Sequence, residues 1–254
     1  QAPSEKEDTI DKDGQKLLEN LRRSHKLLTE GVATFPRQAT FKGDEVISDY
    51  TELCLVDNYL ELEQQENSHF RRLGNILKDY PIYNEFLAGI RGVGPAMAGV
   101  IISEMDIAKA EYPSSLHKYA GLDVASDGQG RSRRKEHLED SQYTDADGEI
   151  KTKKGITFNP FLKTKLVGVL GSSFIKQPAD KCKYRQVYDD YKHRIEHMDA
   201  HKEKSKGHRH NMAVRYMIKI FLIDLYNEWR RIEGLPVAPT YSEAKLGKVH
   251  GKAA

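Results

Sequence analysis

The chain has 254 residues, 31% of them charged, and its formal net charge is only +2. Its mean hydropathy is −0.68, no apolar run is long enough to cross a bilayer and no secretory signal begins the chain, so we expect a soluble cytoplasmic protein of one or two domains. The two cysteines, Cys54 and Cys182, lie far apart in the sequence, which argues against a disulfide framework and against a zinc site built from CxxC pairs.

The first part of the chain is predicted to hold a polar tail and one helix, followed by a long helical arm. Residues 1–43 include a leucine-rich helical pattern over 14–31. Over 44–80 the apolar positions recur at threes and fours, interrupted by the polar stretch 63–69, which predicts one long amphipathic helix or a helical pair. We expect this arm either to form a coiled coil between copies of the chain or to pack on its own domain. Tyr80-Pro81 ends it.

The next segment, 87–102, reads as two short apolar helices joined by Gly-Val-Gly. Gly92 and Gly94 tolerate positive φ values and let a phosphate approach the main-chain N–H groups around Val93. Pro95 suits the first position of the second helix, whose free N–H groups favour an anion. The pattern predicts a helix-hairpin-helix that contacts a nucleic-acid backbone; the alternative is an ordinary corner between two helices.

The middle of the chain combines a short helix with an irregular basic region. A helix through Leu116 is followed by 123–160, which lacks helical periodicity and contains Asp147-Gly148, a hairpin turn signal. We expect a small β-ribbon there, with its basic residues pointing outward. Because total charge is small, binding of a polyanion would depend on local clusters, of which this region supplies one. That cluster is Arg131, Arg133, Arg134 and Lys135.

The last third is predicted to be helical over 161–174, 183–202 and 210–233, with Asn159-Pro160 as the first start. These helices carry Lys163, Lys165 and Arg215. Residues 81–235 then form one domain, and the small, polar and basic residues 236–254 form a mobile tail. The expected fold class is mainly α, a helical arm followed by a helix-hairpin-helix domain with a small β-ribbon insert.

Few residues qualify for catalysis or metal binding. We find no alternating βαβ pattern that would carry paired carboxylates for two divalent ions, so a hydroxyl nucleophile is the more natural candidate for DNA cleavage. Ser126 and Ser132 adjoin the basic cluster and serve either as that nucleophile or simply as turn formers. His193, His197 and His201 are spaced to line one helix face, which we interpret as a solvated basic face rather than a metal site. No cofactor or metal site is evident.

Several of these stretches together resemble one family. Residues 80–105, the Tyr-Ala-Gly-Leu of 119–122, the Asn-Pro-Phe-Leu-Lys of 159–163 and the helix 213–218 are similar to the C-terminal transposase domain of DEDD-type insertion-sequence transposases, over roughly 60–235. The resemblance implies a mostly helical DNA-binding recombinase domain that partners an N-terminal RuvC-like domain with an acidic tetrad and divalent metal. It also implies a serine that attacks DNA, guided in some members by a structured RNA.

The chain departs from the family in two places. No RuvC-like segment precedes the helical arm, so divalent metal would enter only through a missing or partner domain. A gapless match puts Gln129 where the family's serine stands, which leaves Ser126 or Ser132 for that role if the loop is shifted. The insert 136–154 also makes the loop longer than is usual in the family.

These patterns predict a transposase-related, nucleoid-associated DNA-binding protein that acts in transposition or recombination of a mobile element. The alternatives are a non-catalytic adaptor derived from a transposase and a helical scaffold that oligomerises through 44–80. DNA and structured RNA are not separated by the sequence, and enzymatic activity stays open. The expected DNA contacts are Gly92, Val93, Gly94, Pro95, Arg131, Arg133, Arg134, Lys135, Lys163, Lys165 and Arg215.

Overall fold

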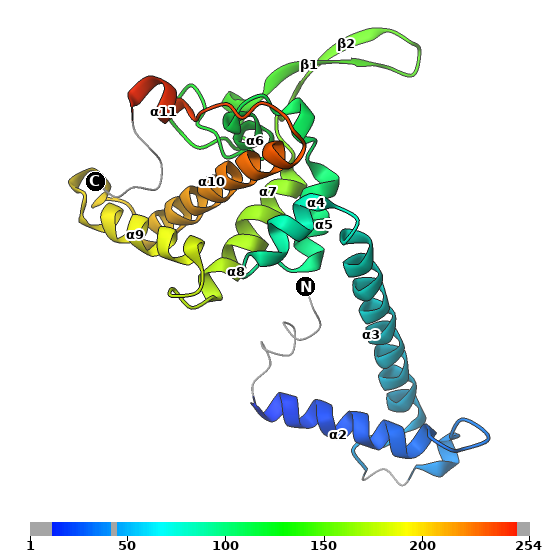
Figure 1. Ribbon diagram of the computed structural model, residues 1–254. Helices are drawn as coiled ribbons and strands as arrows, with labels where there is room; N and C mark the ends of the chain where they lie inside the picture. Colours follow the sequence, from blue (N-terminus) through cyan, green and yellow to red (C-terminus); the bar gives the residue numbers. More distant parts are fainter. Residues whose placement is uncertain (1–11, 42–44, 248–254) are drawn as a thin grey trace. The chain divides into compact units, whose positions relative to one another are not determined.

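The computed structural model describes residues 12–41 and 45–247 (Figure 1). The chain divides into two compact units, Gln1–Ile76 and Leu77–Ala254. The described residues are mainly helical and include one two-stranded sheet, which confirms the expected fold class. None of the described helices combines the length and the apolar character needed to span a membrane.

The first unit contains α2 (Lys12–Thr29), the 3₁₀ turn η1 (Gln38–Thr40) and most of α3 (Tyr50–Leu77). Helix α3 is continuous, so of the two predicted alternatives the single long helix is confirmed and the helical pair is wrong. It also begins later than expected, because Asp49 Oδ1 accepts the N–H of Glu52 at 2.9 Å and so caps the helix. Residues 1–11 and 42–44 of the predicted tail and arm lie outside the described residues.

The polar stretch inside α3 has a structural role. Glu63 receives a 2.8 Å ion pair from Arg22 of α2, and Asp57 contacts His25 at 2.8 Å. These pairs fix α2 on α3, so the polar residues hold two helices together instead of interrupting one. Other apolar residues of α3, such as Leu55 and Leu62, stay about two-thirds exposed within the described part of the chain. Oligomer formation through the arm therefore stays a prediction.

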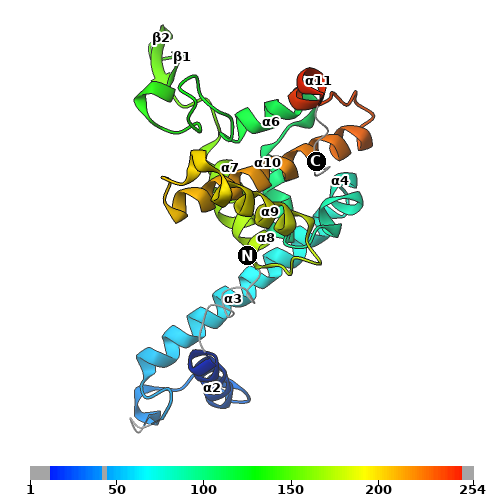
Figure 2. The same ribbon diagram turned by 90° about the vertical axis from the view of Figure 1, so that its left-hand side faces the viewer.

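The second unit is built around α10 (Lys206–Ile232), as Figures 1 and 2 both show. An aromatic cluster forms its core: the ring of Phe174 lies 4.8 Å from that of Tyr184 and 5.6 Å from that of Phe221. Burial of aromatic side chains contributes strongly to such a core. The helices that contact α10 include α4 (Pro81–Glu85), α6 (Pro113–Tyr119), α8 (Gly171–Lys176) and α9 (Lys183–His197).

The helix-hairpin-helix consists of α4, the 3₁₀ turn η2 (Leu87–Gly89) and α5 (Pro95–Glu104). The first of the two helices predicted within 87–102 is wrong: only the 3₁₀ turn η2 stands there, and α4 precedes the predicted segment. Pro95 occupies the first turn of α5, as predicted. Gly92 has φ +93°, but Gly94 has φ −85°, so the prediction of positive φ holds for Gly92 and is wrong for Gly94.

The Tyr-Ala-Gly-Leu motif forms the end of α6. Gly121 has φ +63°, its N–H donates to Lys118 O, and the N–H of Leu122 donates to His117 O at 2.8 Å. This pattern is a Schellman C-cap, which satisfies carbonyls that the helix leaves without partners. A Cβ on Gly121 would lie 2.5 Å from the ring of Phe158. Backbone conformation and packing therefore both require glycine here.

A second continuous helical path begins at Asn159, whose Oδ1 accepts the N–H of Leu162 at 3.0 Å. It comprises α7 (Pro160–Thr164), the π-helical segment η5 (Lys165–Leu170) and α8. The prediction of a helix starting at Asn159-Pro160 is confirmed. Helix α9, in contrast, ends at His197, and His201 lies in the 3₁₀ turn η6 (Asp199–His201). The prediction that His193, His197 and His201 line one helix face is therefore wrong for His201.

The predicted ribbon and tail are both structured. Strands β1 (Glu139–Thr144) and β2 (Ile150–Gly155) pair antiparallel around Asp147-Gly148, and the ribbon points away from the helices in Figures 1 and 2. Helix α11 (Tyr241–Leu246) has a capping box formed by Thr240. The prediction of a mobile tail is wrong for residues 236–247, because Arg230 and Tyr226 hydrogen-bond Pro236 and Ala238. Residues 248–254 lie outside the described residues.

Candidate anion-binding site

The candidate site is formed around the loop that connects α6 to the β-ribbon. Val124 and Gly130 form a β-bridge, and Ala125 N–H donates to Gln129 O at 2.8 Å. Gln129, the position matched to the family's serine, lies exposed where this tight turn closes. It also brings Asp123 beside Arg131.

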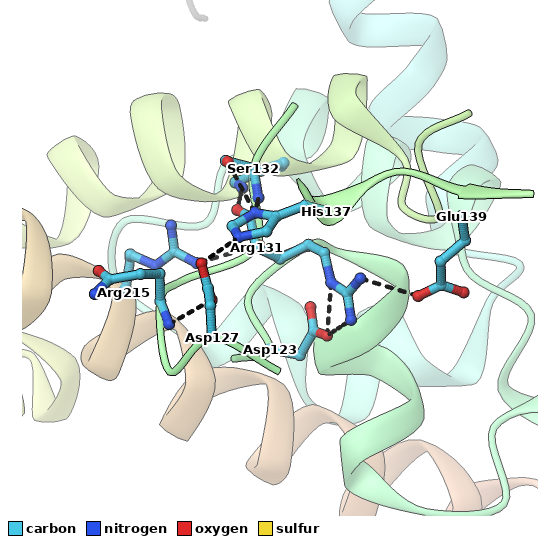
Figure 3. Close-up of polar contacts among 10 residues, drawn as sticks. Asp123, Asp127, Arg131, Ser132, His137, Glu139 and Arg215 are labelled. Atoms are coloured by element: carbon cyan, nitrogen blue, oxygen red, sulfur yellow. Dashed lines mark hydrogen bonds and ion pairs between the residues drawn. The ribbon is translucent and has the colours of Figure 1, made fainter. Parts of the chain in front are cut away.

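Arg131 makes the central ion pairs of this loop (Figure 3). Its Nη2 lies 2.9 Å from Asp123 Oδ2, its Nη1 lies 3.0 Å from Glu139 Oε1, and the Arg131 side chain is only 12% exposed. The hydrogen bond to Asp123 raises the pKa of Arg131. Arg131 thus anchors the base of the ribbon to the end of α6.

Lys163 of α7 approaches the same loop from the other side. Its ammonium donates to the carbonyl of Arg131 at 2.6 Å and lies 4.5 Å from the centroid of the Phe158 ring. Burial, followed by repulsion from Arg215, lowers the pKa of Lys163 to about 8. Desolvation of a cation disfavours its charged form, so the lowered pKa indicates that the Lys163 ammonium lacks enough negative charge nearby to offset its burial.

Two cations from α10 complete the group. Arg215 and Lys219 are one turn apart and half-buried. Burial lowers the pKa of both, and the charge of Arg215 lowers that of Lys219 further. The guanidinium of Arg215 donates to Gly121 O at 3.3 Å, and a Cβ on Gly130 would lie 2.9 Å from its Nη2. Glycine at 130 therefore leaves room for this arginine.

We call Arg131, Lys163, Arg215 and Lys219 the cation cluster. Asp123 lies among them and Glu139 at their edge, so four cations face two carboxylates. Among the described residues, the Asp123 carboxylate forms an ion pair only with Arg131, and its Oδ1 is buried without a hydrogen bond. Partly buried charges of one sign are costly unless compensated. The cluster can therefore bind an anion, which would stabilise the charged form of its cations.

A hydrogen-bonded chain of three side chains lies beside the cluster (Figure 3). The N–H of Ser132 donates to Nδ1 of His137 at 2.9 Å, and Nε2 of His137 lies 3.0 Å from Asp127 Oδ2. A main-chain N–H can only donate, so Nδ1 accepts and the proton of the neutral ring is on Nε2. The bond from His137 holds the pKa of Asp127 below its ordinary value. His137 is almost fully buried.

The hydroxyl of Ser132 lies 2.9 Å from the same Nδ1 and accepts the N–H of Arg134 at 3.3 Å. The geometry allows His137 to accept the hydroxyl proton, as a general base does. However, the Ser132 N–H also donates to this nitrogen, so the hydroxyl and the main chain share one lone pair of His137. A structural lock of the loop is therefore as consistent with the geometry as a catalytic pair. Ser126 is exposed and makes no side-chain hydrogen bond among the described residues.

The structure brings some of the predicted contacts together and separates others. Arg131, Lys163 and Arg215 meet in the cation cluster, whereas Lys165 projects elsewhere, because residues two apart on a helix differ by about 200°. Arg131 is committed to ion pairs, so it contributes charge rather than a free guanidinium. The exposed basic residues beside the cluster are Arg133, Arg134 and Lys135.

The Gly-Val-Gly turn lies further along the α7–α8 path. Gly92 O accepts the hydroxyl of Ser173 at 2.8 Å, roughly 15 Å along the helix from Lys163. The side chain of Val93 is buried and its N–H donates to Ile90 O, so neither group is free to contact a phosphate. The N–H groups of Gly94, Ala96 and Met97 donate to no acceptor in the described part of the chain.

Sequence reasoning missed Asp123, Asp127, His137 and Lys219. One available signal was the presence of Lys219 and Arg215 within the otherwise apolar helix of 212–229, where a cation needs a reason to be buried. The carboxylates and His137 gave no signal, because their contacts depend on how the loop folds back.

The ribbon presents its basic residues outward, as expected, but it adds no net positive charge to the surface. Its lysines, Lys151, Lys153 and Lys154, point to solvent, but the segment 139–155 holds five acidic residues against these three. Lys151 also pairs with Asp145 at the turn.

Within residues 12–41 and 45–247, no group of three or more His, Cys, Asp or Glu side chains is arranged to hold a metal ion. No family model, no curated protein and no solved structure matches the chain.

Proposed function

We propose that the second unit binds the phosphate backbone of DNA and that the protein acts in DNA transposition or recombination. The cation cluster carries this proposal: four partly buried cations against two carboxylates favour an anion with several oxygens. The exposed Arg133, Arg134 and Lys135 beside it add charge that solvent-accessible phosphates can reach. The transposase relationship rests on the sequence motifs alone.

The turn at Gly94 supplies a second contact in this proposal. Its unpaired N–H groups lie at the N-terminus of α5, where the helix dipole favours an anion. Ser173, which contacts Gly92 beside this turn, lies roughly 15 Å along the helix from Lys163, a length that corresponds to roughly four to five base pairs of duplex. Two backbone contacts at this spacing would position a duplex without reading its sequence.

The remaining parts of the proposal follow from the resemblance and, for oligomer formation, from the apolar periodicity of residues 44–80. Any divalent metal belongs to a separate acidic domain, the protein is associated with the nucleoid, and copies of the chain associate through the α3 arm. Structured RNA is the competing ligand. The second candidate class, a non-catalytic adaptor, predicts the same DNA binding without strand cleavage.

Fluorescence anisotropy over a salt series tests DNA binding. We expect log K for duplex DNA to fall with log salt by about 0.9 per phosphate contacted. Arg215→Gln and Lys219→Gln should each weaken binding and make that slope shallower by about one contact. Lys16→Gln, on the exposed face of α2, removes the same charge from the first unit and is the matched control. Unchanged binding by both cluster variants, or tighter binding of structured RNA than of duplex DNA, contradicts the proposal.

The hydrogen bond between Ser132 and His137 favours an enzymatic version. In it, Ser132 Oγ bonds to the phosphorus of a DNA phosphodiester as the bond to the departing sugar oxygen breaks. His137 accepts the hydroxyl proton at Nδ1 and the departing oxygen takes up a proton. An adduct between protein and labelled DNA that survives denaturation should form with the wild type and Ser126→Ala but not with Ser132→Ala. DNA binding without any adduct supports the adaptor.

A further inference from the structure

A cavity of about 570 Å³ lies between α6, α10 and the C-terminal helix α11. Its volume is in the range of small-molecule pockets, about 300–1,000 Å³. The first turn of α6 and one face of α10 form two walls, and the segment from Pro239 to Ala244 forms the third. Arg230 and Tyr226 hold the chain that leads to this segment, and the capping box at Thr240 starts α11. The cavity is therefore present without a ligand.

The side chains around this cavity suit a flat, largely apolar ring. Tyr112 and Tyr241, which are 55% and 71% exposed, lie at the cavity, together with the ring of Tyr216. Tyr216 is fixed from behind by stacking on Tyr191, with ring centroids 4.0 Å apart. Ile223 adds an aliphatic wall. Aromatic rings of this kind stack on nucleobases of any sequence.

Lys219 connects this cavity to the cation cluster. It lines the cavity and also interacts electrostatically with Arg215 and Asp123. The described residues that line the cavity include no acidic side chain, and Lys219 is not in an ion pair with any of the described residues. A ligand whose ring is covalently linked to a phosphate could therefore place the ring in the cavity and the phosphate at Lys219.

We propose that this cavity receives one unstacked nucleobase of a DNA strand whose adjacent phosphate lies at Lys219 and Arg215. This inference rests on the proposed function and deepens it, because it assigns the protein a preference for DNA with an unpaired nucleotide. Unstacking a base costs a few kcal/mol in an intact duplex and least at a mismatch, a branch or a single strand. A protein with such a pocket would favour branched or single-stranded DNA over a plain duplex.

The test compares a single strand carrying normal bases with an abasic strand of the same length, which presents the same phosphates without rings. Wild-type protein should bind the normal strand about tenfold more tightly, the value expected for one base stacked on aromatic rings. The double variant Tyr112→Ala, Tyr241→Ala should lose this difference, whereas Tyr112→Phe, Tyr241→Phe should keep it. Both tyrosines are mainly exposed, so these changes should not unfold the protein.

Tyr80→Ala is the matched control, because Tyr80 is 43% exposed and does not line the cavity. Equal binding of normal and abasic strands by the wild type, or an undiminished difference in the alanine double variant, would overturn the base pocket and leave backbone binding in place. Failure of every DNA form to bind at low salt would overturn the proposed function and the pocket together.

Discussion

The ammonium of Lys163 donates a 2.6 Å hydrogen bond to the main-chain carbonyl of Arg131, and so joins α7 to the loop that carries the basic residues. Arg131 in turn pairs with Asp123 at the end of α6. These two contacts hold α7, the loop at Arg131 and the end of α6 around a partly buried positive charge. Several expected outcomes depend on this arrangement.

The affinity for DNA should fall as pH rises above about 8. The pKa of Lys163 is lowered to about 8 in the free protein, and a bound phosphate favours the charged form. Binding above that pH therefore requires uptake of a proton, which costs up to about tenfold in affinity per pH unit. Anisotropy at constant salt from pH 7 to 10 measures this. Lys163→Gln should bind more weakly at pH 7 and flatten the profile; a wild-type profile that is equally flat contradicts the prediction.

Because its pKa is lowered in the folded state, Lys163 should also make folding stability increase with pH between about 8 and 10.5. The unfolded state keeps Lys163 protonated up to its ordinary value near 10.5, whereas the folded state loses the proton near 8. The unfolded state binds more protons between these values, so the contribution of Lys163 to stability rises with pH across that window. Denaturant unfolding at pH 7 and 9.5 should show that the stability of the wild type relative to Lys163→Gln is higher at pH 9.5 than at pH 7.

Lys219→Met should make the protein more stable and a weaker DNA binder. The Lys219 ammonium is half-buried with no ion pair among the described residues, and burial lowers its pKa. Replacing it by an apolar chain of similar length removes the desolvation cost, on the order of 1 kcal/mol. Urea unfolding measures the gain, and Lys16→Met, an exposed site, should show little change. Loss of stability in Lys219→Met would show that the ammonium has a structural partner.

The two glycines of the Gly-Val-Gly turn should respond differently to substitution. A Cβ at Gly92 would lie 2.8 Å from Phe174 Cδ1, and the residue has φ +93°. Gly92→Ala should therefore cost about 1–3 kcal/mol or more of stability. Gly94 has open space around it and an extended backbone, so Gly94→Val should fold normally and weaken DNA binding by blocking the N–H groups. Normal DNA affinity of folded Gly94→Val would exclude a phosphate contact at this turn.

His137→Ala should destabilise the protein much more than Ser132→Ala. His137 is almost fully buried, and its removal leaves the Ser132 N–H without its acceptor, a loss of about 1–3 kcal/mol. Ser132→Ala keeps that N–H bond and removes only the hydroxyl, so it should cost less than about 1 kcal/mol. Thermal unfolding checks both. If Ser132→Ala is as unstable as His137→Ala, loss of an adduct in that variant says nothing about chemistry.

Several elements could be predicted because their causes are local. The capping Asn159 with Pro160, the turn at Asp147-Gly148 and Pro95 at the start of α5 each act through neighbouring residues, and each lies where the sequence predicts it. The end of α9 at His197 and the start of α3 at Tyr50 were predicted less well. Helix ends depend on capping contacts that periodicity does not reveal.

The candidate site was predicted only in part. Basic residues at 131, 163 and 215 can be recognised in the sequence, but nothing local shows that Arg131 is ion-paired while Lys163 and Arg215 lack a carboxylate of their own. The exposed positions of Gln129 and Ser126 and the contact between Ser132 and His137 likewise depend on the turn that closes through Val124 and Gly130.

The sequence by itself determined the mainly helical class, the helix-hairpin-helix and the ribbon, because turn chemistry, capping and periodicity act over a few residues. Only the tertiary structure decided which charges are compensated. Asp123, Lys163 and Lys219 are separated by long stretches of chain, and burial of their charges arises when α6, α7 and α10 pack together. The cavity beside α11 exists for the same reason, since its three walls come from distant segments.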